Sequence, residues 1–144
     1  MPRLDSRTTA LAHGLYYAIG GAWPLVSIES FEKVTGGKWD DWLVRTVGWL
    51  MVALAGGFLP ASRRGVPREL KIVGVLSSAS VGGIAAYYAA RGRISKLYFL
   101  DAALQFALTA LWIRALTEPE TTPAAAEERA RRDEVAEAAV ESIV

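Results

Sequence analysis

The stretch IVGVLSSASVGGIAAYYAA, residues 72–90, decides the fold class because its 19 consecutive residues carry no charge. Lys71 precedes it and Arg91 follows it. A helix of this length comes close to the roughly 30 Å thickness of the hydrocarbon core of a bilayer, which about 20 apolar residues span. A soluble helix would need a polar stripe repeating every three or four residues, and this stretch offers only small serines for it. The stretch therefore predicts a transmembrane helix.

Three further windows share this property. Residues 8–28 form an uncharged run of 21, residues 46–62 a run of 17, and residues 97–113 a window of 17 interrupted only by Asp101. Four such windows are rare in a soluble protein of 144 residues, and we expect an all-α, up-down-up-down four-helix transmembrane bundle. A soluble bundle, or a cleaved signal peptide in place of the first helix, remains an alternative. The expected helices are 8–26, 42–59, 70–90 and 95–116.

The composition excludes much of the usual chemistry of small domains. The 144 residues hold no cysteine and one histidine, and the formal net charge is +1. Disulfides, thiolate zinc sites, thiol catalysis and cysteine-ligated iron–sulfur clusters are therefore excluded, and the length allows a single domain. The net charge is an average over two regions: residues 1–117 carry +6, whereas residues 118–144 carry −5. We expect a membrane domain over 1–117 and an acidic, soluble tail over 118–144 that is helical or partly disordered.

The distribution of lysine and arginine predicts the orientation. With the N-terminus in the cytoplasm, ten basic residues lie on the cytoplasmic side and six on the other. This difference depends mainly on the segment SRRGVPREL, residues 62–70, between the second and third helices. We expect a multi-pass protein of the bacterial cytoplasmic (inner) membrane with both termini in the cytoplasm.

Small residues recur at helical spacing on two of the expected helices. Such faces let helix backbones approach closely, which drives association where lipid removes the hydrophobic effect between helices. Gly92, between two arginines, predicts a tight turn that makes the third and fourth helices antiparallel neighbours. We expect helix–helix packing at Gly14, Ala18, Gly74, Ser78, Gly82 and Ala86.

Asp101 is the main candidate for a functional residue. A carboxylate within a span is costly, so it should face the bundle interior and have a partner, with Gln105 one turn further on the same face. Arg45 lies at a similar depth in the second helix and is the expected partner. The pair is either a structural clamp or part of a polar pocket that opens outward, with Tyr98 and Gln105 as hydrogen-bonding walls.

Two other groups of residues invite a functional interpretation. His13, within the first span, suggests an interhelical hydrogen bond or a proton relay, and it could bind haem only with a second ligand. Trp23, Trp39 and Trp42 are interpreted as anchors at the membrane interface. The acidic residues around this connection are roughly neutralised by nearby basic ones, so no metal site is predicted there. The acidic residues are Glu29, Glu32, Asp40 and Asp41, and the basic ones are Lys33, Lys38 and Arg45. No catalytic motif occurs.

The run SFEKVTGGKWDDWLVRTVG, residues 30–48, together with YFLDAALQ, residues 98–105, resembles small bacterial four-span membrane proteins of DoxX-like general shape. The resemblance covers residues 11–116. Some DoxX-like relatives are associated with quinone-linked sulfur oxidation. The resemblance transfers no catalytic residue, but it favours an outer pocket that includes Glu32 and Asp101.

These observations lead to two expectations about function. The first is a non-enzymatic accessory, assembly or structural membrane subunit that acts through helix packing. The alternative is a DoxX-like, oxidoreductase-associated subunit with an outward-facing pocket of Asp101, Arg45, Glu32 and Tyr98, or, as a further alternative, a small transporter. No cofactor is predicted, although haem and quinone remain open. The expected partners are membrane lipid and other membrane subunits or further copies of the chain, and no nucleic acid.

Overall fold

A computed structural model describes residues 5–37, 40–117 and 131 of the chain. The described part contains helices and no strands, in agreement with the predicted all-α class. The predicted tail lies outside the described residues except for Arg131, which is helical. The helices are α1 (Ser6–Val26), α2 (Ile28–Thr35), α3 (Asp41–Arg64), α4 (Arg68–Ala90) and α5 (Tyr98–Thr117).

Three of these helices, α3, α4 and α5, are long and apolar enough to cross a membrane. α1 has 21 residues but does not meet the same standard of hydropathy. Its sequence includes His13, two tyrosines and three glycines, which lower the mean hydropathy that its leucines and isoleucine would otherwise give. The structure therefore supports a helical membrane protein with three apolar spans.

The boundaries differ from the expected ones chiefly around Pro60. The sequence predicted that the second helix ends at residue 59, whereas α3 continues through Pro60 to Arg64. A proline inside a helix removes one backbone donor and kinks or breaks the helix at a cost of about 3 kcal/mol, and in α3 the helix continues for another turn beyond it. α3 ends instead at Gly65, whose φ of 115° suits glycine and whose N–H donates to Ala61 O. The loop to α4 is thus shortened to residues 65–67.

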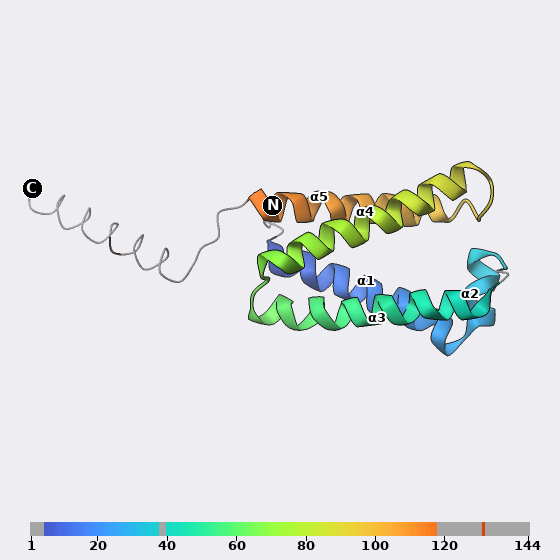
Figure 1. Cartoon of the computed structure of the whole chain (residues 1–144), viewed down its shortest axis with the longest axis horizontal. Coiled ribbons are helices and arrows are strands. Elements are labelled where there is room, and N and C mark those ends of the chain that lie inside the picture. Colours follow the sequence, from blue (N-terminus) through green and yellow to red (C-terminus); the bar gives the residue numbers. More distant parts are fainter. Residues whose placement is uncertain (1–4, 38–39, 118–130, 132–144) are drawn as a thin grey trace, which may run out of the picture.

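The helices are arranged as two packed pairs (Figure 1). α1 packs along α3, and α4 packs antiparallel along α5 through the turn at Gly92, where φ is 66°. The prediction that the third and fourth expected helices are antiparallel neighbours is thus confirmed. α1 joins the pairs, because it contacts α5 and α4 as well as α3. The short α2 lies at the same end of the molecule as the turn between α4 and α5 (Figure 1).

Glycine and serine bring the helices of each pair close together. A Cβ atom at Gly14 would lie 2.8 Å from Leu59 Cδ2 in α3, and one at Gly74 would lie 2.5 Å from the Trp112 ring in α5. A Cβ at Gly82 would lie 2.9 Å from Gln105 Cβ. Ser78 adds a hydrogen bond of 2.8 Å between its hydroxyl and that of Thr109. The predicted small faces of α1 and α4 therefore lie against α3 and α5, respectively.

Not every predicted packing position is fully covered. Ala18 is half-buried beside the core, and Ala86 is half-buried on α4. In α4 the buried face shifts from Gly82 to Ala85 and Ala89. A strict four-residue spacing drifts around a helix of 3.6 residues per turn, so the covered face moves back by one position after a few turns.

Buried aromatic side chains fill the centre of the bundle. Tyr17, Phe58 and Trp112 are fully buried and pack around the His13 ring. The outer faces, by contrast, expose large apolar side chains, including Trp49 at 65%, Ile84 at 63% and Leu100 at 61%. Apolar exposure spread over α3, α4 and α5 is what a surface in contact with lipid requires, and it is unfavourable in water.

Candidate functional site

A cavity of about 640 Å³ lies between the two helix pairs at the end of the bundle that carries α2. α1 and α3 form one wall and α5 forms the opposite one, with Val81 contributed by α4. Phe31 and Thr35 of α2 close part of its end. Most of the lining is aliphatic or aromatic, which makes the cavity suited to an apolar molecule.

Among the residues that the structure describes, Asp101 is the one charged side chain that lines this cavity. It is half-buried, one turn from the start of α5, and its Oδ1 atom accepts a hydrogen bond from the Tyr16 hydroxyl of α1. This bond links the two helix pairs at the cavity wall. Because Tyr16 donates, the carboxylate keeps acceptor positions for a further donor.

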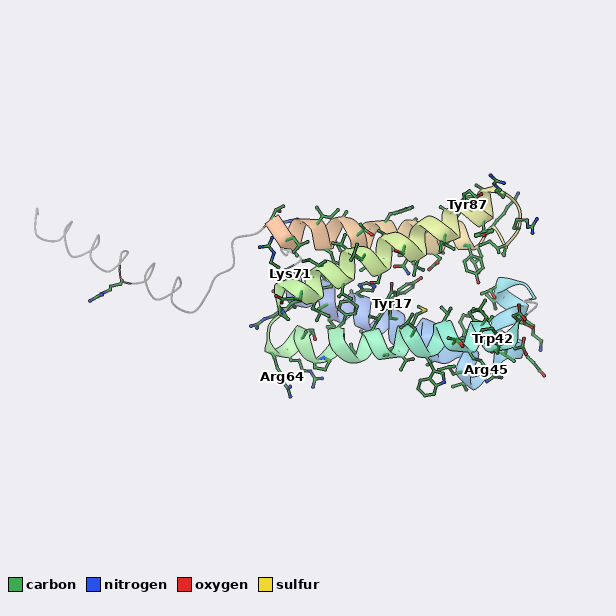
Figure 2. The ribbon with its side chains drawn as sticks, viewed as in Figure 1. Tyr17, Trp42, Arg45, Arg64, Lys71 and Tyr87 are labelled. Carbon is green, nitrogen blue, oxygen red and sulfur yellow. The ribbon has the colours of Figure 1, made fainter. Side chains whose placement is uncertain are left out.

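Arg45 does not pair with Asp101, and this correction changes the expected site. The Arg45 side chain is exposed, and its Nη1 atom donates to Leu25 O at 3.4 Å. Figure 2 shows Arg45 near the α2 end of α3, on the far side of the molecule from α5. The reason is the arrangement of the helices. α1 lies against both α3 and α5, so the nearest polar partner of Asp101 is Tyr16 of α1.

The other residues predicted for the pocket are divided between three places. Tyr98 lines the cavity beside Asp101. Gln105 is fully buried behind the cavity, between α5 and α4, and does not line it. Glu32 is half-buried on α2 and is not part of the lining, whereas its neighbour Phe31 is. The polar pocket expected from the sequence is therefore mainly an apolar cavity with one acidic wall position.

The predicted interface anchors also differ in their surroundings. Trp23 lines the cavity, donates from Nε1 to Ser30 Oγ at 2.8 Å and packs edge-on against Phe31. Trp42 is 67% exposed near the start of α3, as an anchor at a membrane surface would be (Figure 2). Trp39 lies outside the described residues.

His13 takes part in an interhelical hydrogen bond. Its Nδ1 atom accepts from Trp112 Nε1 at 2.9 Å, and its ring stacks on Phe58 with centroids 4.6 Å apart. His13 is fully buried, so its ring is enclosed by protein rather than open to a large planar cofactor. Within the described residues, no group of three or more histidine, aspartate or glutamate side chains is placed to hold a metal ion.

Sequence reasoning did not single out Tyr16 as a site residue. Tyr16, Gly20 and Trp23 share one face of α1, at helical spacings of four and three residues, and all three line the cavity. A tyrosine on the same face as a glycine and a tryptophan is a signal that could have indicated a cavity wall. The same pattern does not indicate that α5 forms the opposite wall of the cavity.

No family model matches the chain, and no curated protein or solved structure is similar enough to match it.

Proposed function

We propose that the chain is a four-span integral membrane protein whose cavity binds a lipophilic organic cation. The observation that carries the proposal is a single carboxylate, Asp101, on the wall of a largely apolar cavity of about 640 Å³. The proposal develops the outward-facing pocket expected from the sequence and omits Arg45 and Glu32 from it.

The fourth span in this proposal is α1. Its buried face packs on α3 and α5, while Leu11, Leu15 and Ile19 on its other side are 45%, 47% and 69% exposed. An apolar face of this kind, beside three apolar helices, favours immersion of α1 with its neighbours. The small and polar residues that lower its hydropathy are mostly those turned inward, such as His13, Gly14 and Tyr17.

The orientation follows from the basic residues. Arg63, Arg64 and Arg68 border the loop between α3 and α4, at the opposite end of the bundle from α2. With this loop in the cytoplasm, as the positive-inside rule favours, the cavity lies toward the outer side of the membrane.

The chemistry of the cavity favours a cation over a neutral acceptor. A carboxylate removed from water needs a compensating charge or hydrogen-bond donors, and Tyr16 supplies one donor. A protonated amine would supply the charge, while the aromatic rings of Trp23 and Phe31 would attract the same cation. A quinone carries only acceptor oxygens and would face an acceptor at Asp101, so the quinone chemistry implied by the DoxX-like resemblance fits this wall less well.

Three probes of similar apolar character separate these possibilities. Tetraphenylphosphonium is a lipophilic cation, tetraphenylborate is an anion of nearly the same shape, and a short-chain ubiquinone is a neutral acceptor. We expect the purified protein in detergent to bind the cation at least about tenfold more tightly than the other two, a difference of about 1.4 kcal/mol. Asp101→Asn should abolish this preference. Equal binding of the cation and the anion would contradict the proposal.

A cavity-filling variant tests whether the cavity is the binding site. Gly20 lines the cavity, and a Cβ there would meet only Met51 Cε at 3.4 Å, so Gly20→Leu projects into the open space. Gly56, on α3, has nothing within 4 Å of a Cβ and is exposed, so Gly56→Leu is the matched control. Loss of binding in the first variant alone is expected. Loss in both variants, or in neither, would move the site elsewhere.

The accessory-subunit role stays a prediction. It requires a partner, which affinity purification from native membranes would recover at a constant ratio. Comparison of the full chain with a form that lacks residues 118–144 tests whether the acidic tail holds that partner. The absence of any such companion in both preparations would contradict the role.

A further inference from the structure

Three neighbouring side chains in the centre of the bundle have polar atoms that make no hydrogen bond to any described residue. These atoms are His13 Nε2, Tyr17 Oη, and Nε2 and Oε1 of Gln105. All three side chains are fully buried. They belong to α1 and α5 and are separate from the lining of the cavity described above.

The three side chains lie next to one another. The His13 and Tyr17 rings meet edge-on with centroids 4.1 Å apart. The Gln105 and Ser77 side chains lie close enough to the Tyr17 hydroxyl to act on it as hydrogen-bond partners, although neither contact has the geometry of a hydrogen bond. Figure 2 shows Tyr17 directed into the interior between the helix pairs. Nearby, the Thr109 hydroxyl is bonded to Gln105 O at 2.9 Å and to the Ser78 hydroxyl at 2.8 Å. The polar atoms of Tyr17 and Gln105 thus share one region, and the His13 ring borders it.

The bond from Trp112 determines which atoms of this region are donors. Trp112 Nε1 can only donate, so His13 Nδ1 is an acceptor and neutral His13 carries its proton on Nε2. His13 Nε2 and Gln105 Nε2 therefore offer donors, Gln105 Oε1 offers an acceptor, and the Tyr17 hydroxyl can act as either. Donors and acceptors at adjacent positions are the set of partners that a buried water molecule requires, which is typically about three.

Leaving four such atoms unbonded would be costly. Buried polar groups in proteins are almost always hydrogen-bonded, and each one left without a partner costs about 1–3 kcal/mol. We propose that His13, Tyr17 and Gln105 form an internal water-binding site at the centre of the membrane domain.

Two ionisable side chains of the interior lie near the site. Asp101 precedes Gln105 by one helical turn, about 6 Å along α5, and His13 borders the other side of the site. This inference does not depend on the ligand proposed for the cavity, because it rests on atoms that do not line it.

The sign of a stability change tests the inference. Tyr17→Phe removes only the hydroxyl, and Gln105→Met removes the amide from a side chain of similar length. If water satisfies these groups, each change takes a partner from the water and should lower Tm by roughly 2–4 °C for each kcal/mol lost. If the region is dry, each change removes an unsatisfied polar group, and an unchanged or raised Tm overturns the inference. Tyr87→Phe is the matched control. Tyr87 is 51% exposed, so the Tm of this variant should equal that of the wild-type protein.

Radiolytic footprinting in ¹⁸O-labelled water provides a readout that does not depend on how well the variants fold. Water bound beside Tyr17 should lead to oxidation of this ring in the wild-type protein, although the ring is fully buried. The oxidation should be lost in Gln105→Met, while exposed Tyr87 is oxidised in both proteins. A wild-type Tyr17 that stays unoxidised overturns the inference.

Discussion

The contact between Gly21 of α1 and Gly48 of α3 offers the sharpest test of the packing. A Cβ at Gly21 would lie 2.6 Å from Gly48 O and 2.8 Å from Met51 Cβ, against 3.4 Å or more in ordinary contact. Gly21→Ala must therefore push the two helices apart by most of an ångström. Because the nearest atom belongs to the backbone, no side-chain rotation relieves the contact.

The expected loss of stability follows from two opposing effects. Overpacking costs about 1–3 kcal/mol, and the rigid backbone contact favours the upper end of that range. The replacement of glycine by alanine within a helix returns about 1 kcal/mol. We expect Gly21→Ala to lower the free energy of unfolding by about 2 kcal/mol, and Gly56→Ala, where a Cβ meets nothing within 4 Å, to raise it by up to about 1 kcal/mol.

The assay is unfolding in mixed micelles of increasing SDS content, followed by tryptophan fluorescence and circular dichroism. The double variant Gly21→Ala/Gly48→Ala should lose less than the sum of the single losses, because one separation of the helices relieves both contacts. Equal midpoints for Gly21→Ala and Gly56→Ala would refute the close crossing of α1 and α3.

Three further outcomes are expected. Trp112→Phe removes the donor to His13 Nδ1 and should cost about 1–3 kcal/mol of stability in the same titration; no loss would mean that the bond is absent. Gly74→Ala places a Cβ 2.5 Å from the Trp112 ring, and it should destabilise the wild-type protein more than the Trp112→Leu background, where the ring is absent. Asp5 accepts from Thr8 N at 2.8 Å at the start of α1, and this bond lowers the pKa of its carboxyl below 3.8. Its contribution is therefore present above pH 3.8 and is lost as the pH falls through the lower folded value, so Asp5→Ala should destabilise by about 1 kcal/mol at pH 7 and by less in acid.

Much of the helical organisation could be predicted because it depends on local properties of the chain. The uncharged run 72–90 lies within α4, and the windows 46–62 and 97–113 lie within or almost within α3 and α5. The tight turn at Gly92 was also predictable, since a left-handed φ of 66° suits glycine. The end of α3 was not predictable, because the effect of Pro60 depends on whether the surrounding turns keep their hydrogen bonds.

The candidate site could be predicted only in part. An aspartate in an apolar span must find a partner, and this requirement identified Asp101 from the sequence. Depth along the helices then suggested Arg45, but depth does not say which helices touch. The partner is Tyr16, on a helix that lies against both α3 and α5.

The sequence by itself determined the four long helices apart from their exact ends, the apolar character of three spans and the need of Asp101 for a partner, because each of these depends on residues close together in the chain. Only the tertiary structure decided that α1 joins the two helix pairs, that a cavity of about 640 Å³ opens beside Asp101, and that His13, Tyr17 and Gln105 meet in the interior. These features depend on the crossing of helices that are distant in sequence. Close contacts between backbones, such as that of Gly21 with Gly48, set those crossings, and no local pattern specifies which pair of glycines will meet.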